Sequence, residues 1–166
     1  MEFTFKNMTL FVGVLLTGLS AGFFYAWSVS VILGTKKVLD PTYLETMQHI
    51  NREILNPSFF LIFFGSMIVL AIGTLTQQGS GATFWLMLSA TIVYVMGTFA
   101  VTGLGNVPLN NELEALNLSE MGTSKLTEFR QYYEVKWNQF HLIRTIFSVV
   151  AFLISLLAVF MSSKNI

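Results

Sequence analysis

The sequence predicts an all-α integral membrane protein, built as a four-helix bundle with an amphipathic helical cap on one side. The chain of 166 residues is 54% hydrophobic and only 11% charged, a composition that soluble globular domains do not show. It contains four apolar runs long enough for helices that cross about 30 Å of hydrocarbon. Two long polar stretches interrupt these runs. Two spans lie between the stretches, so both stretches are on the same side of the membrane.

The four apolar runs define the expected spans. They cover residues 8–33, 59–75, 82–104 and 140–161. The first run is longer, and its start less basic, than in a cleaved signal peptide, so we expect a retained helix. The second run is only just long enough to span. A short uncharged turn at residues 77–81 returns the third run antiparallel to the second.

The first polar excursion, residues 34–57, predicts an amphipathic helix that is too polar to span. Asp40 and Pro41 indicate its start, as an N-cap followed by proline at the first helical position. Asn56 and Pro57 end this helix and can start the second span. The apolar side chains between them share one helical face: Tyr43, Leu44, Met47, Ile50, Ile54 and Leu55.

The second polar excursion covers residues 105–139. It opens with a turn-rich stretch, Gly-Asn-Val-Pro-Leu-Asn at 105–110, followed by a short helical pattern. A helical period resumes near Thr123 and continues into the fourth apolar run. Because no Gly or Pro occurs between Thr123 and Met161, the sequence predicts one long helix there.

Charge and residue content limit the partners of the chain. Nine Lys and Arg residues balance nine Asp and Glu residues, so nothing indicates nucleic-acid binding. Without cysteine there is no disulfide and no thiolate metal ligand. We expect membrane lipid and a hydrophobic small molecule as partners, and a homo-oligomer remains open. The Lys36–Lys37 pair predicts that the polar excursions are cytoplasmic, and we expect a bacterial plasma membrane.

The candidate site lies at the start of the fourth span. Trp137, His141, Arg144 and Ser148 fall on one helical face at about 100° per residue. Arg144 is thus about one turn inside an apolar segment, where an unpaired guanidinium is costly. One interpretation is an interfacial His and an Arg that extends to lipid headgroups. The other is an inward-facing pair, in which Arg144 holds a carboxylate, phenolate or enolate and His141 transfers a proton.

Other polar residues are weaker candidates. His49 lies opposite the apolar face of its helix, so we expect it to be solvated. Only His141 is then placed as a metal ligand, and we expect no metal site and no cofactor. Asn51 lies near the edge of the apolar face and needs partners if it is buried. Asn106 and Asn110 either build a capped turn or orient a ligand.

Taken together, these residues resemble the anthrone oxygenase-like family of small four-span membrane proteins. The most distinctive part is Gly-Asn-Val-Pro-Leu-Asn at 105–110. Trp137, His141 and Arg144 opening the fourth span fit as well, as does Gln48-x-x-Asn51. The resemblance covers nearly the whole chain. It implies these motif positions: Asn51, Asn106, Pro108, Asn110, Trp137, His141 and Arg144.

Characterised members of that family oxidise polycyclic anthrones to anthraquinones with molecular oxygen, without a metal or flavin. The resemblance therefore implies a cofactor-independent oxygenase that acts on a hydrophobic polycyclic or phenolic small molecule. In this interpretation His141 and Arg144 are catalytic. The substrate-binding residues are then Asn51, Asn106, Asn110 and Trp137. From their positions at the same end of the bundle, we expect Tyr25, Trp27 and Tyr133 to bind the substrate as flat aromatic walls. The resemblance does not fix the substrate of this member.

The alternative is a non-enzymatic membrane protein that binds lipid or a partner, or moves a small solute. The two classes predict different structures. An enzyme should have an enclosed pocket that His141 and Arg144 reach. A transporter should have a polar path to both sides of the membrane, and a lipid or partner binder should turn these residues outward.

Overall fold

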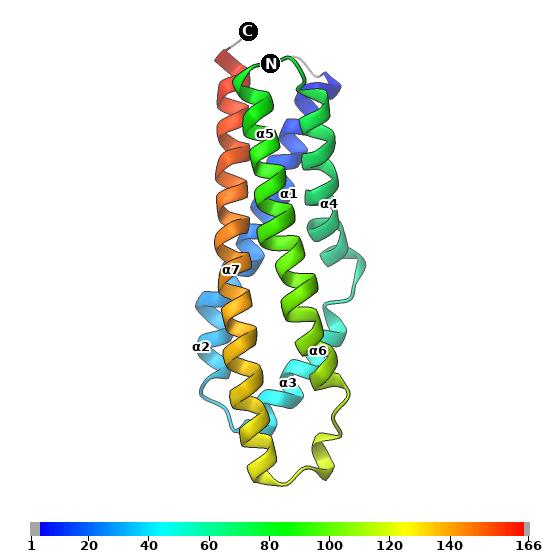
Figure 1. The fold of residues 1–166 in the computed structure, drawn as a ribbon, viewed down its shortest axis with the longest axis vertical. Coiled ribbons are helices and arrows are strands. Elements are labelled where there is room, and N and C mark those ends of the chain that lie inside the picture. The colour runs from blue at the N-terminus through cyan, green and yellow to red at the C-terminus, as the bar shows by residue number, and fades with distance from the viewer. Residues whose placement is uncertain (1–3, 165–166) are drawn as a thin grey trace.

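The computed structural model describes residues 4–164, and the regular elements within that range are all helical. Four long apolar helical stretches run side by side (Figure 1): Phe5–Thr35, Pro57–Thr76, Ala82–Glu114 and Thr123–Ser163. Each of them is long and apolar enough to cross a membrane. The predicted all-α bundle, which fits an integral membrane protein, is therefore confirmed.

Each long helix packs against two of the others. α1 (Phe5–Ala26) and α5 (Ala82–Val93) lie on opposite sides of the bundle, and each packs between α4 (Pro57–Thr76) and α7 (Thr123–Lys164). The side chain of Asn56 caps the start of α4 by accepting a hydrogen bond from the Phe59 amide at 3.0 Å. α7 is the single long helix that the absence of Gly and Pro predicts.

The two ends of the bundle differ. One end carries both termini of the described chain (Figure 1) and the turn between α4 and α5. In that turn Gly79 and Gly81 have φ angles of 78° and 55°, which glycine adopts without strain. The other end carries a cap made of α3 (Asp40–Glu53), α6 (Val107–Glu114) and the short 3₁₀ helix η4 (Leu118–Glu120).

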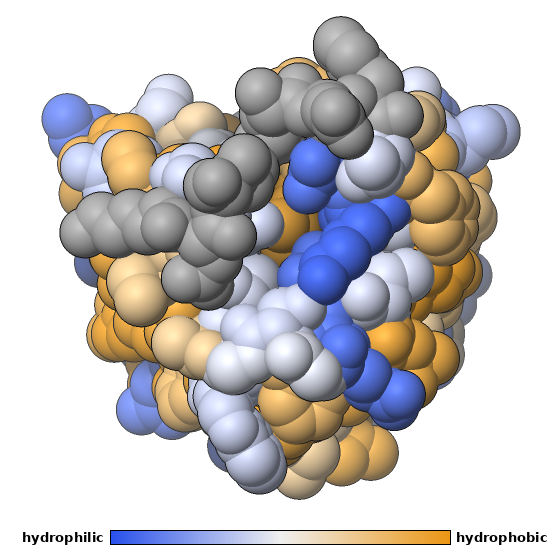
Figure 2. All heavy atoms as spheres, turned by 90° about the horizontal axis from the view of Figure 1, so that it is seen from above, coloured by the Kyte–Doolittle hydropathy of each residue, from blue (hydrophilic) through white to orange (hydrophobic). Residues whose placement is uncertain are grey.

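Hydrophobic side chains cover the outside of the bundle, as lipid contact requires. Exposed examples on the four spans are Phe11, Leu15, Ile68, Met96 and Leu153. Viewed from the terminus end, hydrophobic side chains occupy the sides while hydrophilic ones cross the end face (Figure 2). Inside, hydroxyl groups link the helices, with Ser20 Oγ 2.9 Å from Tyr94 Oη and Thr17 Oγ1 3.2 Å from Ser155 Oγ, a common mode of packing between membrane helices.

The cap forms because α3 buries the first half of its predicted apolar face. Tyr43, Leu44 and Met47 are buried. They belong to one hydrophobic cluster with Leu113 of α6 and Tyr133 of α7. The second half of the same face lines the cavity described below, so α3 joins the cap core to the candidate site.

The stretch at 105–110 differs from its prediction. It is not a turn, because the helix of the third span continues through it. The continuation runs first through the π-helical segments η2 (Tyr94–Ala100) and η3 (Thr102–Asn106), and then into α6. Pro108 falls in the first turn of α6, directly after η3. Inside a continuous helix a proline removes one backbone hydrogen bond and crowds the preceding turn. The π segments before it take up the irregularity, as they commonly do beside functional sites.

Candidate functional site

His141 lies on the inward face of α7 and is only 1% exposed. Its Nδ1 is 3.2 Å from Nε and 3.1 Å from Nη2 of Arg144. Because a guanidinium only donates, Nδ1 accepts and carries no hydrogen. Nε2 lies 2.9 Å from Ser28 Oγ and 3.2 Å from the carbonyl oxygen of Phe24. A carbonyl oxygen only accepts, so the hydrogen of the neutral imidazole is on Nε2.

Two hydroxyl groups agree with this tautomer. Ser28 Oγ donates to the Phe24 carbonyl at 3.1 Å. Thr145 Oγ1 donates to the His141 carbonyl at 2.7 Å and lies 3.3 Å from Nε2. Since each hydroxyl hydrogen is used on a carbonyl, both hydroxyl oxygens are left to accept from Nε2–H. His141 is therefore buried and neutral, and its only ring lone pair points at Arg144.

Arg144 is 7% exposed and lies between two aromatic rings. Its Cζ is 4.7 Å from the ring centroid of Phe24 and 5.0 Å from that of Trp137, distances typical of cation–π contacts. Its Nη1 is 3.5 Å from Thr102 Oγ1. Within residues 4–164, no ion pair includes Arg144. A guanidinium held at this depth without a carboxylate is costly, and it faces a cavity in which an anion would compensate it.

Two asparagines reach the same region from the cap. Asn110 Oδ1 accepts from Trp137 Nε1 at 2.8 Å and from the Tyr133 hydroxyl at 3.1 Å. The Tyr133 oxygen in turn accepts from Asn51 Nδ2 at 3.2 Å. We call Trp137, Asn110, Tyr133 and Asn51 the amide row. It ties α3 and α6 to α7 through polar contacts that have specific donors and acceptors.

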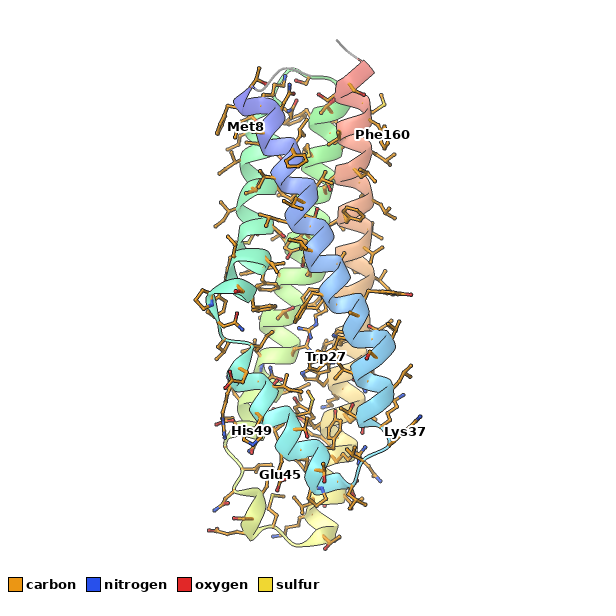
Figure 3. All side chains as sticks on the ribbon, turned by 180° about the vertical axis from the view of Figure 1, so that it is seen from behind. Met8, Trp27, Lys37, Glu45, His49 and Phe160 are labelled. Carbon is orange, nitrogen blue, oxygen red and sulfur yellow. The ribbon has the colours of Figure 1, made fainter. Side chains whose placement is uncertain are left out.

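A cavity of about 410 Å³ lies where the cap meets the spans. This volume is within the range of about 300–1,000 Å³ typical of small-molecule sites. Aromatic walls come from Phe24, Trp27 and Phe59, with Trp27 at the level between the spans and the cap (Figure 3). His141 and Arg144 supply the charged and proton-carrying part of the wall. The cavity therefore combines flat apolar surfaces with a concentrated polar edge.

The exposed residues of the cavity wall form two kinds of rim. Phe23 and Leu55 are apolar and lie next to the start of α4, where Leu55 is 67% exposed. Arg52 and Glu114 are polar and form an ion pair with Nε and Oε1 2.8 Å apart. The apolar rim lies where the second span begins.

Comparison with protein families gives one match. The sequence model of the anthrone oxygenase family matches residues 46–154, which is more than half of the chain. This chain belongs to the anthrone oxygenase family. Comparison with curated proteins and with solved structures finds no match. The matched range includes Asn51, His141 and Arg144, whereas Phe24 and Trp27 of the first span lie outside it.

In this member of the anthrone oxygenase family, most of the predicted site residues meet at the cavity. Those that line it are Trp27, Asn51, Asn110, Trp137, His141 and Arg144. Asn106 and Tyr133, 1% and 0% exposed, are not part of the wall. Tyr133 lies behind it in the amide row, and Asn106 Nδ2 donates to the carbonyl of Trp137 at 3.1 Å. Both residues hold wall residues in place from behind, Asn106 through Trp137 and Tyr133 through Asn110.

Tyr25 is the one predicted site residue that the structure puts outside. Its side chain is 58% exposed and it does not line the cavity. The reason is helical geometry, since one residue corresponds to about 100° of rotation. Phe24 faces inward and contacts Arg144, so its neighbour Tyr25 points away from the centre of the bundle. His49 is exposed on α3, as predicted (Figure 3).

Two contributors were missed from the sequence. Thr102 contacts Arg144 through its hydroxyl group. It lies one helical turn before Asn106, and this places the two on the same face only if the helix continues through 105–110. Phe24 contributes a backbone carbonyl as well as a ring, and a backbone contribution leaves no residue signature. Gly105 also matters here, because a Cβ on it would come within 2.6 Å of the Phe140 ring. That glycine lets η3 pack directly against the part of α7 that carries His141.

Proposed function

We propose that this protein binds a flat hydrophobic molecule with an acidic C–H group, such as an anthrone, and promotes its oxidation by molecular oxygen through the enolate. One observation carries the proposal. Arg144 is a buried guanidinium at a cavity, and no carboxylate among residues 4–164 neutralises it. A fixed cation in a site of low dielectric stabilises negative charge that develops on a ligand.

The first step is the ionisation of the ligand. A ketone or phenolate oxygen that enters the cavity competes for the N–H groups of Arg144, two of which rest on His141 Nδ1. When those donors turn to the ligand, Nδ1 becomes free to accept a proton. The C–H proton then moves to Nδ1, and its electron pair becomes the enolate whose oxygen Arg144 holds.

The second step needs only oxygen. The enolate donates electrons to O₂, a C–O bond forms at the former CH₂ carbon, and the proton on His141 returns to give a hydroperoxide. Loss of water from that hydroperoxide produces the ketone, so that a CH₂ group and O₂ become C=O and H₂O. The residues of this chain hold the ligand, carry the proton and stabilise the anion.

The position of the polar groups supports this function over the non-enzymatic alternative. A protein that binds lipid headgroups would turn His141 and Arg144 outward, and both are buried. The interior hydroxyl groups do not favour a transport path either, because Thr17, Thr74 and Thr91 donate to carbonyls of their own helices. Such bonds are a local way of satisfying hydroxyl groups in apolar helices.

The test uses the two histidines of the chain. The purified protein in detergent is mixed with anthrone and air-saturated buffer, and anthraquinone formation is followed by absorbance. We expect oxidation well above the protein-free rate, lost in His141→Ala and retained in His49→Ala, whose histidine is exposed. Equal rates with the wild-type protein, with His141→Ala and without protein would overturn the proposal. Binding of anthrone without acceleration would favour the non-enzymatic alternative.

A further inference from the structure

The rim of the cavity changes from polar to apolar within a few residues of the chain. Arg52, near the end of α3, is charged, and Leu55, just after that helix, is apolar and exposed. Both line the cavity. Asn56 then caps α4, which begins at Pro57. The apolar part of the rim is therefore next to the start of the second span, and the polar part belongs to the cap.

Two aromatic rings from different helices meet at the apolar part of the rim. Phe23 of α1 and Phe59 of α4 line the cavity, and their ring centroids are 5.7 Å apart at an interplanar angle of 48°. Phe23 is 37% exposed. Exposed side chains change rotamer quickly, so the Phe23 ring can move aside while both helices stay in place. We call Phe23, Leu55 and Phe59 the portal.

The surface around the portal is apolar. The exposed neighbours of Phe23 and Phe59 along their helices are Leu19, Phe60, Leu61 and Phe64. They lie on two of the four helices that are long and apolar enough to cross a membrane. In a bilayer such side chains contact the acyl chains, because each span needs about 30 Å of apolar helix. The portal therefore faces lipid rather than water.

An ion pair closes the polar part of the rim. Arg52 Nε donates to Oε1 of Glu114 at 2.8 Å and to its Oε2 at 3.1 Å. The pair joins α3 to α6, and both residues line the cavity. An apolar molecule that enters from the water must separate these two charges. At the portal the same molecule displaces only apolar side chains.

We propose that ligands exchange between the cavity and the bilayer through the portal, while the Arg52–Glu114 pair closes the cavity toward water. The molecule that passes is neutral, apolar and dissolved in the lipid. This route keeps bulk water away from His141 and Arg144, and charges act more strongly in a site without water. The inference rests on the four spans and on the shape of the rim, and it does not depend on the proposed oxidation.

The test uses an introduced thiol, because the chain contains no cysteine. Thr102→Cys puts the thiol inside the cavity, since Thr102 lines it and is 8% exposed. The protein in phosphatidylcholine nanodiscs is treated with N-phenylmaleimide, which enters lipid, or with N-(4-sulfophenyl)maleimide, which stays in water. Mass spectrometry follows the labelling, and His49→Cys on the exposed face of α3 gives the reactivity of each reagent without a barrier. Relative to that reference, N-phenylmaleimide should label the cavity thiol about tenfold faster.

Further substitutions in the Thr102→Cys protein separate the two sides. Phe23→Ala should speed up N-phenylmaleimide and Phe23→Trp should slow it, each by about threefold to tenfold, without an effect on the sulfonated reagent. Glu114→Ala should admit the sulfonated reagent and leave the N-phenylmaleimide rate unchanged. The matched controls are Phe11→Ala and Glu112→Ala, exposed residues of α1 and α6 that do not line the cavity. Neither control should change either rate.

Three results would overturn the inference: equal relative rates for the two reagents, no response to either Phe23 variant, or no labelling by N-phenylmaleimide even with Phe23→Ala. If Thr102→Cys does not fold, Ile50→Cys supplies a second thiol on the cavity wall and should give the same pattern. The readout is addition to a thiol, so the portal can be established in a protein that fails to oxidise anthrone. Oxidation of anthrone without the expected labelling pattern would keep the proposed function and remove the portal.

Discussion

Two arginines on α7 are buried to almost the same degree, yet their surroundings are opposite. Arg130 is 9% exposed and Arg144 is 7% exposed, and about 21 Å of helix separates them at about 1.5 Å per residue. Arg130 pairs with Asp40 at 2.9 Å and with Glu134 at 3.0 Å. It also donates to the Val38 carbonyl at 2.7 Å. Arg144 has two aromatic rings, an imidazole and a distant hydroxyl.

Burial alone does not mark a functional charge. Arg130 has enough acceptors to satisfy its guanidinium, and its contacts join α7 to the segment between α2 (Ile32–Thr35) and α3. Such a residue stabilises the fold. Arg144 has contacts that orient the guanidinium without neutralising it, which is what a site for a transient anion needs. What distinguishes them is the presence or absence of a carboxylate.

The largest effect should come from Arg144→Met, which keeps the volume and removes the charge. We expect the oxidation of anthrone to fall by about 10³-fold, the scale of losing a main anion-stabilising group. The free energy of unfolding should stay the same or rise, because the variant no longer buries an unpaired charge. Activity and thermal unfolding in detergent are measured on the same preparation. A clear loss of stability at full activity would make Arg144 a structural residue like Arg130.

Arg130→Met should show the reverse pattern. Removing this guanidinium takes away the cation that pairs with Asp40 and Glu134. We expect a loss of about 2–3 kcal/mol in the free energy of unfolding, less than for a fully buried pair because the carboxylates are partly exposed. Arg52→Met is the matched control, since its ion pair with Glu114 is exposed and should contribute about 0–1 kcal/mol. Equal stability of the two variants would show that the acceptors around Arg130 contribute nothing beyond a surface pair.

The sequence predicts the partners of Arg130 better than those of Arg144. The spacing of Arg130 and Glu134 predicts their ion pair, because residues four apart share a helix face. The periodicity of the fourth span likewise predicts that His141 and Arg144 share a face with Trp137. What no pattern shows is the partner of a charge across helices. Whether a carboxylate meets Arg144 depends on where α3 and α6 fold over the bundle, so its lack of one is visible only in three dimensions.

Contacts between helices, which the sequence does not show, also explain why the predictions for 105–110 and Tyr25 were wrong. The stretch 105–110 contains glycine, asparagine and proline, which are typical of turns. Tertiary packing overrides that tendency, because Gly105 faces the Phe140 ring and Asn106 is held by the Trp137 carbonyl. A helix there turns Asn110 toward Trp137, which a turn does not require. Tyr25 was assigned to the site from its position near a span end, and its direction depends on a helical phase that an aromatic-rich run does not define.

Gly105→Ala should disturb the Arg144 region and leave the Arg130 region intact. The new Cβ would lie 2.6 Å from Cγ and Cδ1 of Phe140, so the Phe140 ring, or the part of α7 that carries it and His141, must shift. We expect a loss of about 1–3 kcal/mol and a lower kcat for anthrone. Gly103→Ala is the control, because nothing lies within 4 Å of its Cβ position. Similar kcat values for the two variants would mean that the contact with η3 does not set the position of His141.

The smallest expected effect is a pH dependence of stability, which arises from Asp40, the ion-pair partner of Arg130. The Thr127 hydroxyl donates to Asp40, and together with Arg130 it lowers the pKa of that carboxyl below its ordinary value of 3.8. A carboxyl whose pKa is lower in the folded state stabilises the fold above its unfolded pKa, and this contribution disappears as the pH falls through the folded value. Asp40→Asn should therefore be less stable than the wild-type protein at neutral pH. The difference in unfolding temperature between the two proteins should shrink steadily below about pH 4. A difference that stays constant down to about pH 2 would mean that Asp40 supports the cap by its shape rather than by its charge.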